Sequence, residues 1–189
     1  MKKYILVFTV LFICGLTWYA LKNSFADKTQ NQITDSGKPA PKDYSEIGFE
    51  LMNSESIGAL KIGLSDNDVI KALGEPEEKS EMEIWGADGE NHQTWNYKSK
   101  GIQLDMIGDL KNQVINSMSI KSPCDFKTKR GIGIGSSRTD VSAAYKNEIN
   151  NDDPSVNQSV LIAGSVYGGI IFSFENGTLT TIFIGAAAE

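Results

Sequence analysis

The sequence predicts an α+β protein built from two tandem helix-plus-antiparallel-sheet repeats, whose sheets form one open surface, preceded by an N-terminal apolar helix. Two observations carry this prediction. A motif in residues 62–76 recurs in residues 134–145, with Ile, Gly, Ser, Asp, Val and Ala in register at a constant offset of 72 residues. Such a repeat indicates a duplicated structural unit. Each copy is followed by segments that alternate apolar and polar residues, which is typical of antiparallel strands with one buried face.

The first 26 residues are expected to direct export. Two lysines precede an uncharged apolar run over residues 4–21, and such a run is typical of a signal peptide or of a membrane anchor. Small residues at the third and first positions before a cut favour cleavage after Ala26, whereas the length of the run suits a retained anchor. Lipidation at Cys14 is a third alternative, although Ile13 is larger than the residue that a lipobox places there. We expect the protein in the periplasm or on the outer side of the cytoplasmic membrane.

Residues 27–45 are rich in Lys, Thr, Gln, Asn, Ser and Pro. Because this composition buries too little apolar surface to offset the entropy of ordering, the segment is predicted to be a flexible linker. The first α/β repeat is then expected over residues 46–122 and the second over residues 123–189. The apolar cluster that opens the first repeat, at residues 47–52, fits either a short helix or a lead-in strand.

A capping pattern opens a helix in each repeat. Ser65 precedes Asp68 by three residues, and Ser137 precedes Asp140 in the same way. In this capping box the hydroxyl accepts from a first-turn N–H and the acidic side chain reaches back toward the cap. Gly74 supplies a stop for the first helix. We expect helices over residues 65–73 and 137–149.

Strands are expected after each helix, separated by turn signals such as Asp88-Gly89 and Asn176-Gly177. Their predicted ranges are 81–87, 92–98, 102–107 and 113–120 in the first repeat, and 158–163, 166–174 and 178–184 in the second. Residues 114–120 correspond to residues 178–184, so the offset falls from 72 to 64. The eight extra residues of the first repeat are expected in its acidic segment 75–90.

The net charge limits the classes of partner that the protein can bind, and the cysteine count limits its disulfides. Three of the 18 basic residues and none of the 24 acidic residues lie in residues 1–26, so the remainder carries nine net negative charges. This disfavours nucleic acid and anionic lipid, which need a positive contact surface; a membrane is expected only through the N-terminal segment. Cys124 is the single cysteine after residue 26. It cannot form an internal disulfide and is expected to be a half-buried apolar filler.

These motifs resemble the family of exported small domains that includes the β-lactamase-inhibitory protein and the BamE/SmpA outer-membrane lipoproteins. The matching positions are Ile62, Gly63, Ser65, Val69, Leu73, Gly74 and Pro76 in the first copy, and Thr128, Gly131, Ile132, Ile134, Gly135, Ser137 and Val141 in the second. The resemblance covers about residues 57–187, and two copies favour the tandem, inhibitor-like arrangement. The chain departs from the pattern at residues 145–147, which replace the Leu-Gly helix ending, and in lacking the cysteines for the disulfides of tandem inhibitors.

Catalytic chemistry is not expected, and neither a cofactor nor a metal site is predicted. His92, the single histidine, is expected to be solvated on a strand. The alternating glycines of residues 131–135 lead into a capped helix, so they do not indicate a phosphate loop. Ser136 and Ser137 have no histidine partner nearby in sequence and are assigned to the cap.

Two groups of residues are candidates for binding another protein. One is an acidic run that is either a solvated loop or a docking edge for a basic surface, with calcium binding a weaker alternative because the loop spacing is absent. It contains Glu77, Glu78, Glu81 and Glu83. The other is a set of aromatic residues that anchor an interface if exposed and a core if buried. These are Trp85, Trp95, Tyr97 and Tyr167.

The sequence therefore favours an exported non-enzymatic protein-binding module, such as an inhibitor or immunity protein acting on an envelope or extracellular protein. The alternative is a structural component of the envelope or of outer-membrane assembly.

Overall fold

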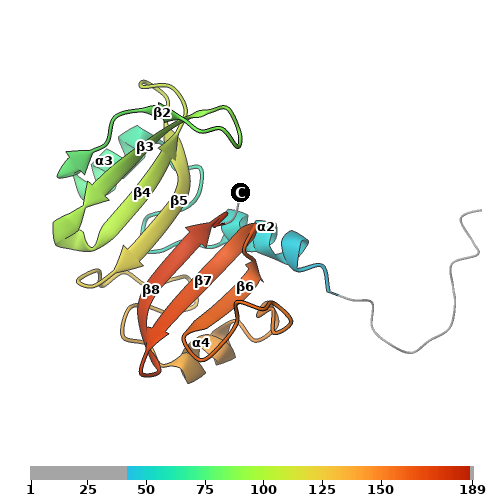
Figure 1. Ribbon diagram of the computed structural model, residues 1–189. Coiled ribbons are helices and arrows are strands. Elements are labelled where there is room, and N and C mark those ends of the chain that lie inside the picture. The colour runs from blue at the N-terminus through green and yellow to red at the C-terminus, as the bar shows by residue number, and fades with distance from the viewer. Residues whose placement is uncertain (1–41, 188–189) are drawn as a thin grey trace, which may run out of the picture. The chain divides into compact units, whose positions relative to one another are not determined.

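The computed structural model describes residues 42–187, which form three α-helices and one open, eight-stranded antiparallel sheet (Figure 1). The predicted α+β class is thereby confirmed. The expected signal peptide or anchor (1–26) and most of the expected linker (27–41) lie outside the described residues. None of the described helices is long and apolar enough to cross a bilayer.

The elements follow one another along the chain in two groups. The first comprises α2 (Tyr44–Ser54), α3 (Asp66–Leu73), β1 (Glu78–Lys79), β2 (Glu83–Ile84), β3 (Asn91–Tyr97), a 3₁₀ turn η1 (Lys98–Lys100), β4 (Ile102–Ile107) and β5 (Val114–Lys121). The second comprises α4 (Arg138–Ala144), β6 (Val160–Ser165), β7 (Gly168–Glu175) and β8 (Thr178–Gly185). We call residues 59–122 the first half and residues 123–187 the second half.

The two halves join into a single sheet through their last strands. The strand order is β1-β3-β4-β5-β8-β7-β6, and β2 also pairs with β3. Figure 1 shows β5 (yellow) beside β8 (red), where Met118 pairs with Ile184 and Ile120 with Ile182. Each half therefore contributes one antiparallel meander.

One hydrophobic core lies between the sheet and the helices. It combines Leu51 of α2, Val69 of α3 and Val141 of α4 with alternate residues of the strands, such as Leu104 and Phe172. Because these residues form one cluster, the three helices lie on the same side of the sheet. The opposite side, which we call the open face, carries the intervening strand residues.

The helix caps are built alike in both halves. Ser65 accepts from the Asp68 N–H at 3.2 Å and Ser137 from the Asp140 N–H at 3.1 Å. The loops before the caps bind the last strands in the same way. The Gly63 N–H donates to the Ile115 carbonyl, and the Gly135 N–H to the Leu179 carbonyl, both at 2.8 Å. The offset is 72 for the loop residues and 64 for the strand residues, as in the sequence.

Two expectations, one about each half, were wrong. The second helix ends at Ala144 and does not continue to Ile149, because Ile149 forms a bridge with Ala163 at the edge of β6. The eight extra residues of the first half do not all lie in segment 75–90. Residues 108–113 join β4 to β5, whereas two residues, 176 and 177, join β7 to β8, so four of the eight lie in this turn.

Helix α2 belongs to the first group in sequence but packs on β6 and β7 of the second half. It begins at Tyr44 after the N-cap Asp43, so its first two residues lie within the predicted linker (27–45). The approach is close: a Cβ added to Gly48 would lie 1.8 Å from the Gly168 carbonyl oxygen. Glycine is therefore required at this crossing, since any side chain would displace the helix.

Candidate functional site

Two of the four aromatic residues that were candidates for an interface are core residues. Trp95 and Tyr97 of β3 are 2% and 1% exposed, and the Tyr97 hydroxyl donates to the Gly74 carbonyl at 3.0 Å. Burial raises the pKa of Tyr97 to about 12, with a further contribution from the charge of Glu75. Both side chains point toward α3, because alternation along β3 places residues 95 and 97 on the inner side. The expectation that they contact a partner is therefore corrected.

The other predicted residues are at the surface but not all together. Tyr167 is 62% exposed in the β6–β7 turn, at the opposite end of the strand order from the acidic run. Glu77 accepts from the Ser99 N–H and hydroxyl, and these bonds lower its pKa. Glu78 pairs with Lys98. Glu81 and Glu83 are exposed and line a hollow beside Trp85.

Trp85 is held against the open face by His92. Its ring is parallel to the imidazole, with a centroid distance of 3.8 Å and an interplanar angle of 2°. The loop that carries Trp85 is closed by two hydrogen bonds, from the Trp85 N–H to Glu90 and from the Gly89 N–H to Trp85. Trp85 is itself partly exposed. It thus has one ring face fixed by the protein while part of the side chain remains accessible.

His92 is buried between two carboxylates, contrary to the solvated position expected from the sequence. It is 2% exposed. Its Nδ1 lies 2.9 Å from Asp105 Oδ2, and its Nε2 lies 2.9 Å from Asp88 Oδ2. Asn116 donates to the same Asp105 oxygen at 2.8 Å. Ionised carboxylates only accept hydrogen bonds, so both contacts need the doubly protonated imidazolium.

The charges of this network stabilise each other. Burial by itself lowers the pKa of His92, but the hydrogen bonds and charges of Asp88 and Asp105 outweigh it, so the pKa is raised. The pKa of Asp88 is lowered, first by the Glu90 N–H and then by His92. Both ring nitrogens are engaged by carboxylates, and neither is free to accept a proton from a nucleophile. The arrangement is suited to fixing the Trp85 loop rather than to acid–base catalysis.

A central hollow of about 190 Å³ opens on the open face between aromatic residues of the two halves. Trp85 lies at one side and Phe183 of β8 at the other, and hydroxyl, amide and carboxylate groups supply the polar lining. Its lining residues are Trp85, Thr94, Gln103, Leu104, Asp105, Ser117, Ser119 and Phe183. Five of these eight residues are polar, so the hollow offers hydrogen-bonding groups between its two aromatic side chains.

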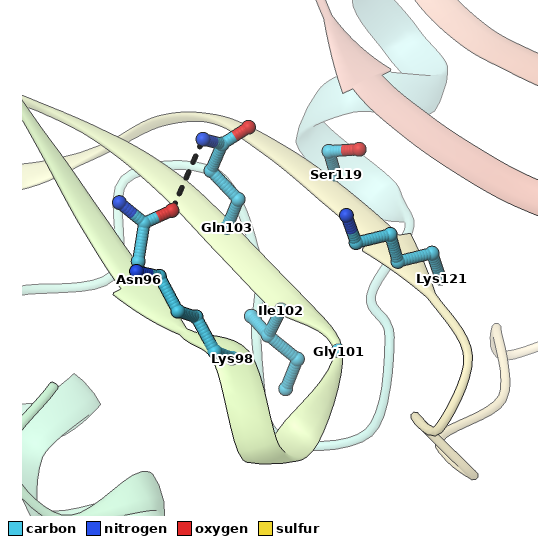
Figure 2. Close-up of a pocket in the computed structure, with 7 residues that line it drawn as sticks. All are labelled: Asn96, Lys98, Gly101, Ile102, Gln103, Ser119 and Lys121. Atoms are coloured by element: carbon cyan, nitrogen blue, oxygen red, sulfur yellow. Dashed lines mark hydrogen bonds between the residues drawn. The ribbon is translucent and has the colours of Figure 1, made fainter. Parts of the chain in front are cut away.

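Two further hollows flank the central one. The acidic hollow, of about 150 Å³, is lined by Ser80, Glu81, Glu83, Trp85, His92, Gln93 and Thr94. The lysine hollow, of about 260 Å³, is lined by Asn96, Lys98, Gly101, Ile102, Gln103, Ser119 and Lys121. Figure 2 shows the lysine hollow with Lys98 and Lys121 on either side of Gln103, whose amide donates to Asn96 at 3.1 Å.

Sequence reasoning missed the residues that position Trp85. His92 and Asp105 occupy open-face positions of adjacent strands, and a more careful use of strand alternation would have placed them on one side of the sheet. Phe183 was also missed, since nothing local distinguishes it from a core residue. The apolar residues next to it, Ile182 and Ile184, are buried, so alternation again places Phe183 on the open face.

Together these features define a small α+β domain with one helix-covered side and one open side that bears an aromatic-lined hollow. Comparisons of the chain with family models, with curated proteins and with solved structures gave no match. Among residues 42–187, no group of three or more His, Cys, Asp or Glu side chains converges as metal ligands do. The site must therefore be interpreted from its own chemistry.

Proposed function

We propose that this protein is an exported, non-enzymatic binding module that holds another protein on its open face, as an inhibitor or immunity protein does. The observation that carries the proposal is the central hollow, in which Trp85 of the first half and Phe183 of the second half face a common space. Aromatic side chains that are fixed before binding are effective interface anchors, because little conformational entropy is lost when the partner arrives. The stack on His92 provides this fixation for Trp85.

The duplicated scaffold supports the same proposal. We infer that the two halves descend from one helix-and-sheet unit, because their caps and their loop-to-strand hydrogen bonds correspond residue by residue. This arrangement fits the tandem, inhibitor-like form that the sequence resembles. Export through residues 1–26 places the partner in the envelope or outside the cell. Mass spectrometry of the natural protein tests whether those residues are cleaved, lipidated or retained.

Site-specific photo-crosslinking in envelope preparations tests the binding face. A photoreactive residue is placed at Gln103, which is exposed beside the central hollow, and at Lys71, which is exposed on α3 on the helix side. We expect a defined crosslinked protein from position 103 and none from position 71. Trp85→Ala should reduce the yield at least tenfold, because a central aromatic anchor contributes about 2 kcal/mol or more. The matched control is Tyr167→Ala, an exposed aromatic distant from the hollow.

Equal crosslinking from positions 103 and 71 would contradict the proposal, as would an unchanged yield from Trp85→Ala.

A further inference from the structure

The three hollows adjoin one another along the open face, mainly over the first half, and we call the row that they form the groove. The acidic and central hollows share Trp85 and Thr94. The central and lysine hollows share Gln103 and Ser119. The groove runs along β3, from the level of His92 to that of Lys98. With about 3.3 Å per residue, these six steps correspond to about 20 Å.

The two ends of this groove carry opposite charge. At one end are Glu81 and Glu83, both exposed, and no ion pair or side-chain hydrogen bond involves their carboxylates within residues 42–187. At the other end are Lys98, which pairs with Glu78, and Lys121, which is exposed and forms no ion pair within the same residues. The ends are separated by more than the Debye length of about 8 Å at physiological salt. Each end therefore acts on a ligand group largely independently of the other.

We propose that the partner docks through a dipolar segment, with a basic side chain at the acidic hollow and a carboxylate about 20 Å further along, at the lysine hollow. This inference rests on the proposed function and specifies the chemistry of the partner. The basic group is attracted by Glu81 and Glu83 and can pack over the accessible part of the Trp85 ring. The carboxylate is attracted by Lys121 and receives hydrogen bonds from the amides that line the lysine hollow.

The polarity also fixes the orientation of the partner. The reversed segment would place a carboxylate beside Glu81 and Glu83 and a cation beside Lys121, and like-charge contacts disfavour a wrong complex. A uniformly basic segment satisfies one end and is repelled by the other. The same holds for a uniformly acidic surface such as nucleic acid or anionic lipid.

Three synthetic peptides test this proposal on the full chain, labelled with ¹⁵N and followed by NMR. The parent peptide carries an Arg and, six positions further on, a Glu, joined by a Ser/Thr spacer; in the two others either Arg or Glu is replaced by Gln. We expect the parent to shift both the Trp85 indole N–H and the Lys121 amide. The peptide without Arg should shift only Lys121, and the peptide without Glu only Trp85. The parent should bind roughly tenfold more tightly than either, because the two contacts are linked.

Charge-neutral variants of the protein give the reciprocal test. The double variant Glu81→Gln with Glu83→Gln should bind the parent peptide no more tightly than the peptide without Arg. The double variant Lys98→Gln with Lys121→Gln should bind the parent peptide no more tightly than the peptide without Glu. Lys71→Gln on α3 is the matched control and should change neither. All these side chains are exposed, so folding is retained, and the amide spectrum verifies it.

The proposal is overturned if the three peptides bind alike, if none shifts either end, or if the shifts lie on the second half away from Phe183, which lines the central hollow. If the peptide tests fail but crosslinking from position 103 still captures a protein, only the dipolar-segment proposal is wrong. If that crosslinking captures nothing, the proposed function is wrong, whatever the peptides do.

Discussion

The two halves share a scaffold but differ on the open face. Both use a serine cap and the same hydrogen bonds between the preceding loop and the last strand. On the open face, the first half presents His92, Asp105 and Gln103, whereas the second half presents mostly uncharged side chains. These are Ile171, Ser173, Thr181 and Phe183, with Glu175 as the single acidic residue at the end of β7. The buried side and the turns are therefore constrained by the fold, and the open face is where the halves have diverged.

The outer edges of the two halves are also covered differently. In the first half, the short strands β1 and β2 pair with β3 and bring the Trp85 loop over the open face. In the second half, the segment after α4 pairs with β6, and α2 packs on β6 and β7 from the helix side. An exposed sheet edge invites pairing with other chains, so each half needs some cover. Of the segments that protect the two edges, only those of the first half, with the Trp85 loop, contribute to the candidate site.

The largest loss of folding stability is expected from displacing α2, because the packing of this helix is found only on the second half. Gly48→Val introduces a Cβ whose position would be 1.8 Å from the Gly168 carbonyl oxygen. Since the Cβ is fixed to the backbone of α2 and the carbonyl oxygen belongs to the backbone of β7, α2 must move away from β6 and β7. We expect a loss of about 3 kcal/mol in the free energy of unfolding, measured by urea denaturation.

Gly86→Ala is the control for this substitution. Nothing lies within 4 Å of a Cβ added at Gly86, so its unfolding free energy should stay within about 0.5 kcal/mol of the unmodified protein. If the two variants are equally stable, the close packing of α2 on the second half is not a major contribution.

A smaller loss of folding stability is expected from replacing His92, whose buried ion pairs are a feature of the first half. His92→Phe keeps a ring beneath Trp85 but leaves Asp105, 11% exposed in its side chain, without its cationic partner. We expect a loss of about 2 kcal/mol. Asp88→Asn is the matched control, because Asp88 is 37% exposed and water can replace the lost bond. An equal loss from the two variants would mean that Asp105 does not depend on His92.

The sequence specifies the repeated parts better than the parts that differ. Ser65, Ser137 and Gly74 are local signals, so the helix starts and the first helix end could be predicted. The end of α4 depends on Ile149 pairing with Ala163, a contact between distant residues that no local pattern contains. The placement of Trp95 and Tyr97 in the core follows from which side of β3 the helices cover. The bond between His92 and Asp105 depends likewise on strand register.

The caps test whether the halves are energetically as well as geometrically equivalent. Ser65→Ala and Ser137→Ala each remove one side-chain acceptor from a first-turn N–H. We expect each single substitution to lower the free energy of unfolding by about 1 kcal/mol. The double variant should lose about 2 kcal/mol, because the effects of distant substitutions add. The measurement is again urea denaturation. A difference of more than about 1 kcal/mol between the single variants would show that one half dominates the stability of the sheet.

The smallest change in folding stability is expected from a change of pH. It should come from the His92 network of the first half. The folded-state pKa of His92 is raised, so its contribution to stability is fully present below the unfolded value of about 6.5. It is lost as the pH rises through the folded value. The pKa of Asp88 is lowered, so its contribution is present above about pH 4 and is lost as the pH falls through its folded value.

The melting temperature should therefore be highest between about pH 4 and 6.5 and should decline on the alkaline side. The decline should be smaller than the loss in His92→Phe, because the neutral ring still packs against Trp85 and retains one hydrogen bond. In His92→Phe the alkaline decline should be absent, since no group in the network then releases a proton in that range. An alkaline decline of the same size in this variant would place the titrating group elsewhere and would remove the imidazolium from the account of how Trp85 is held.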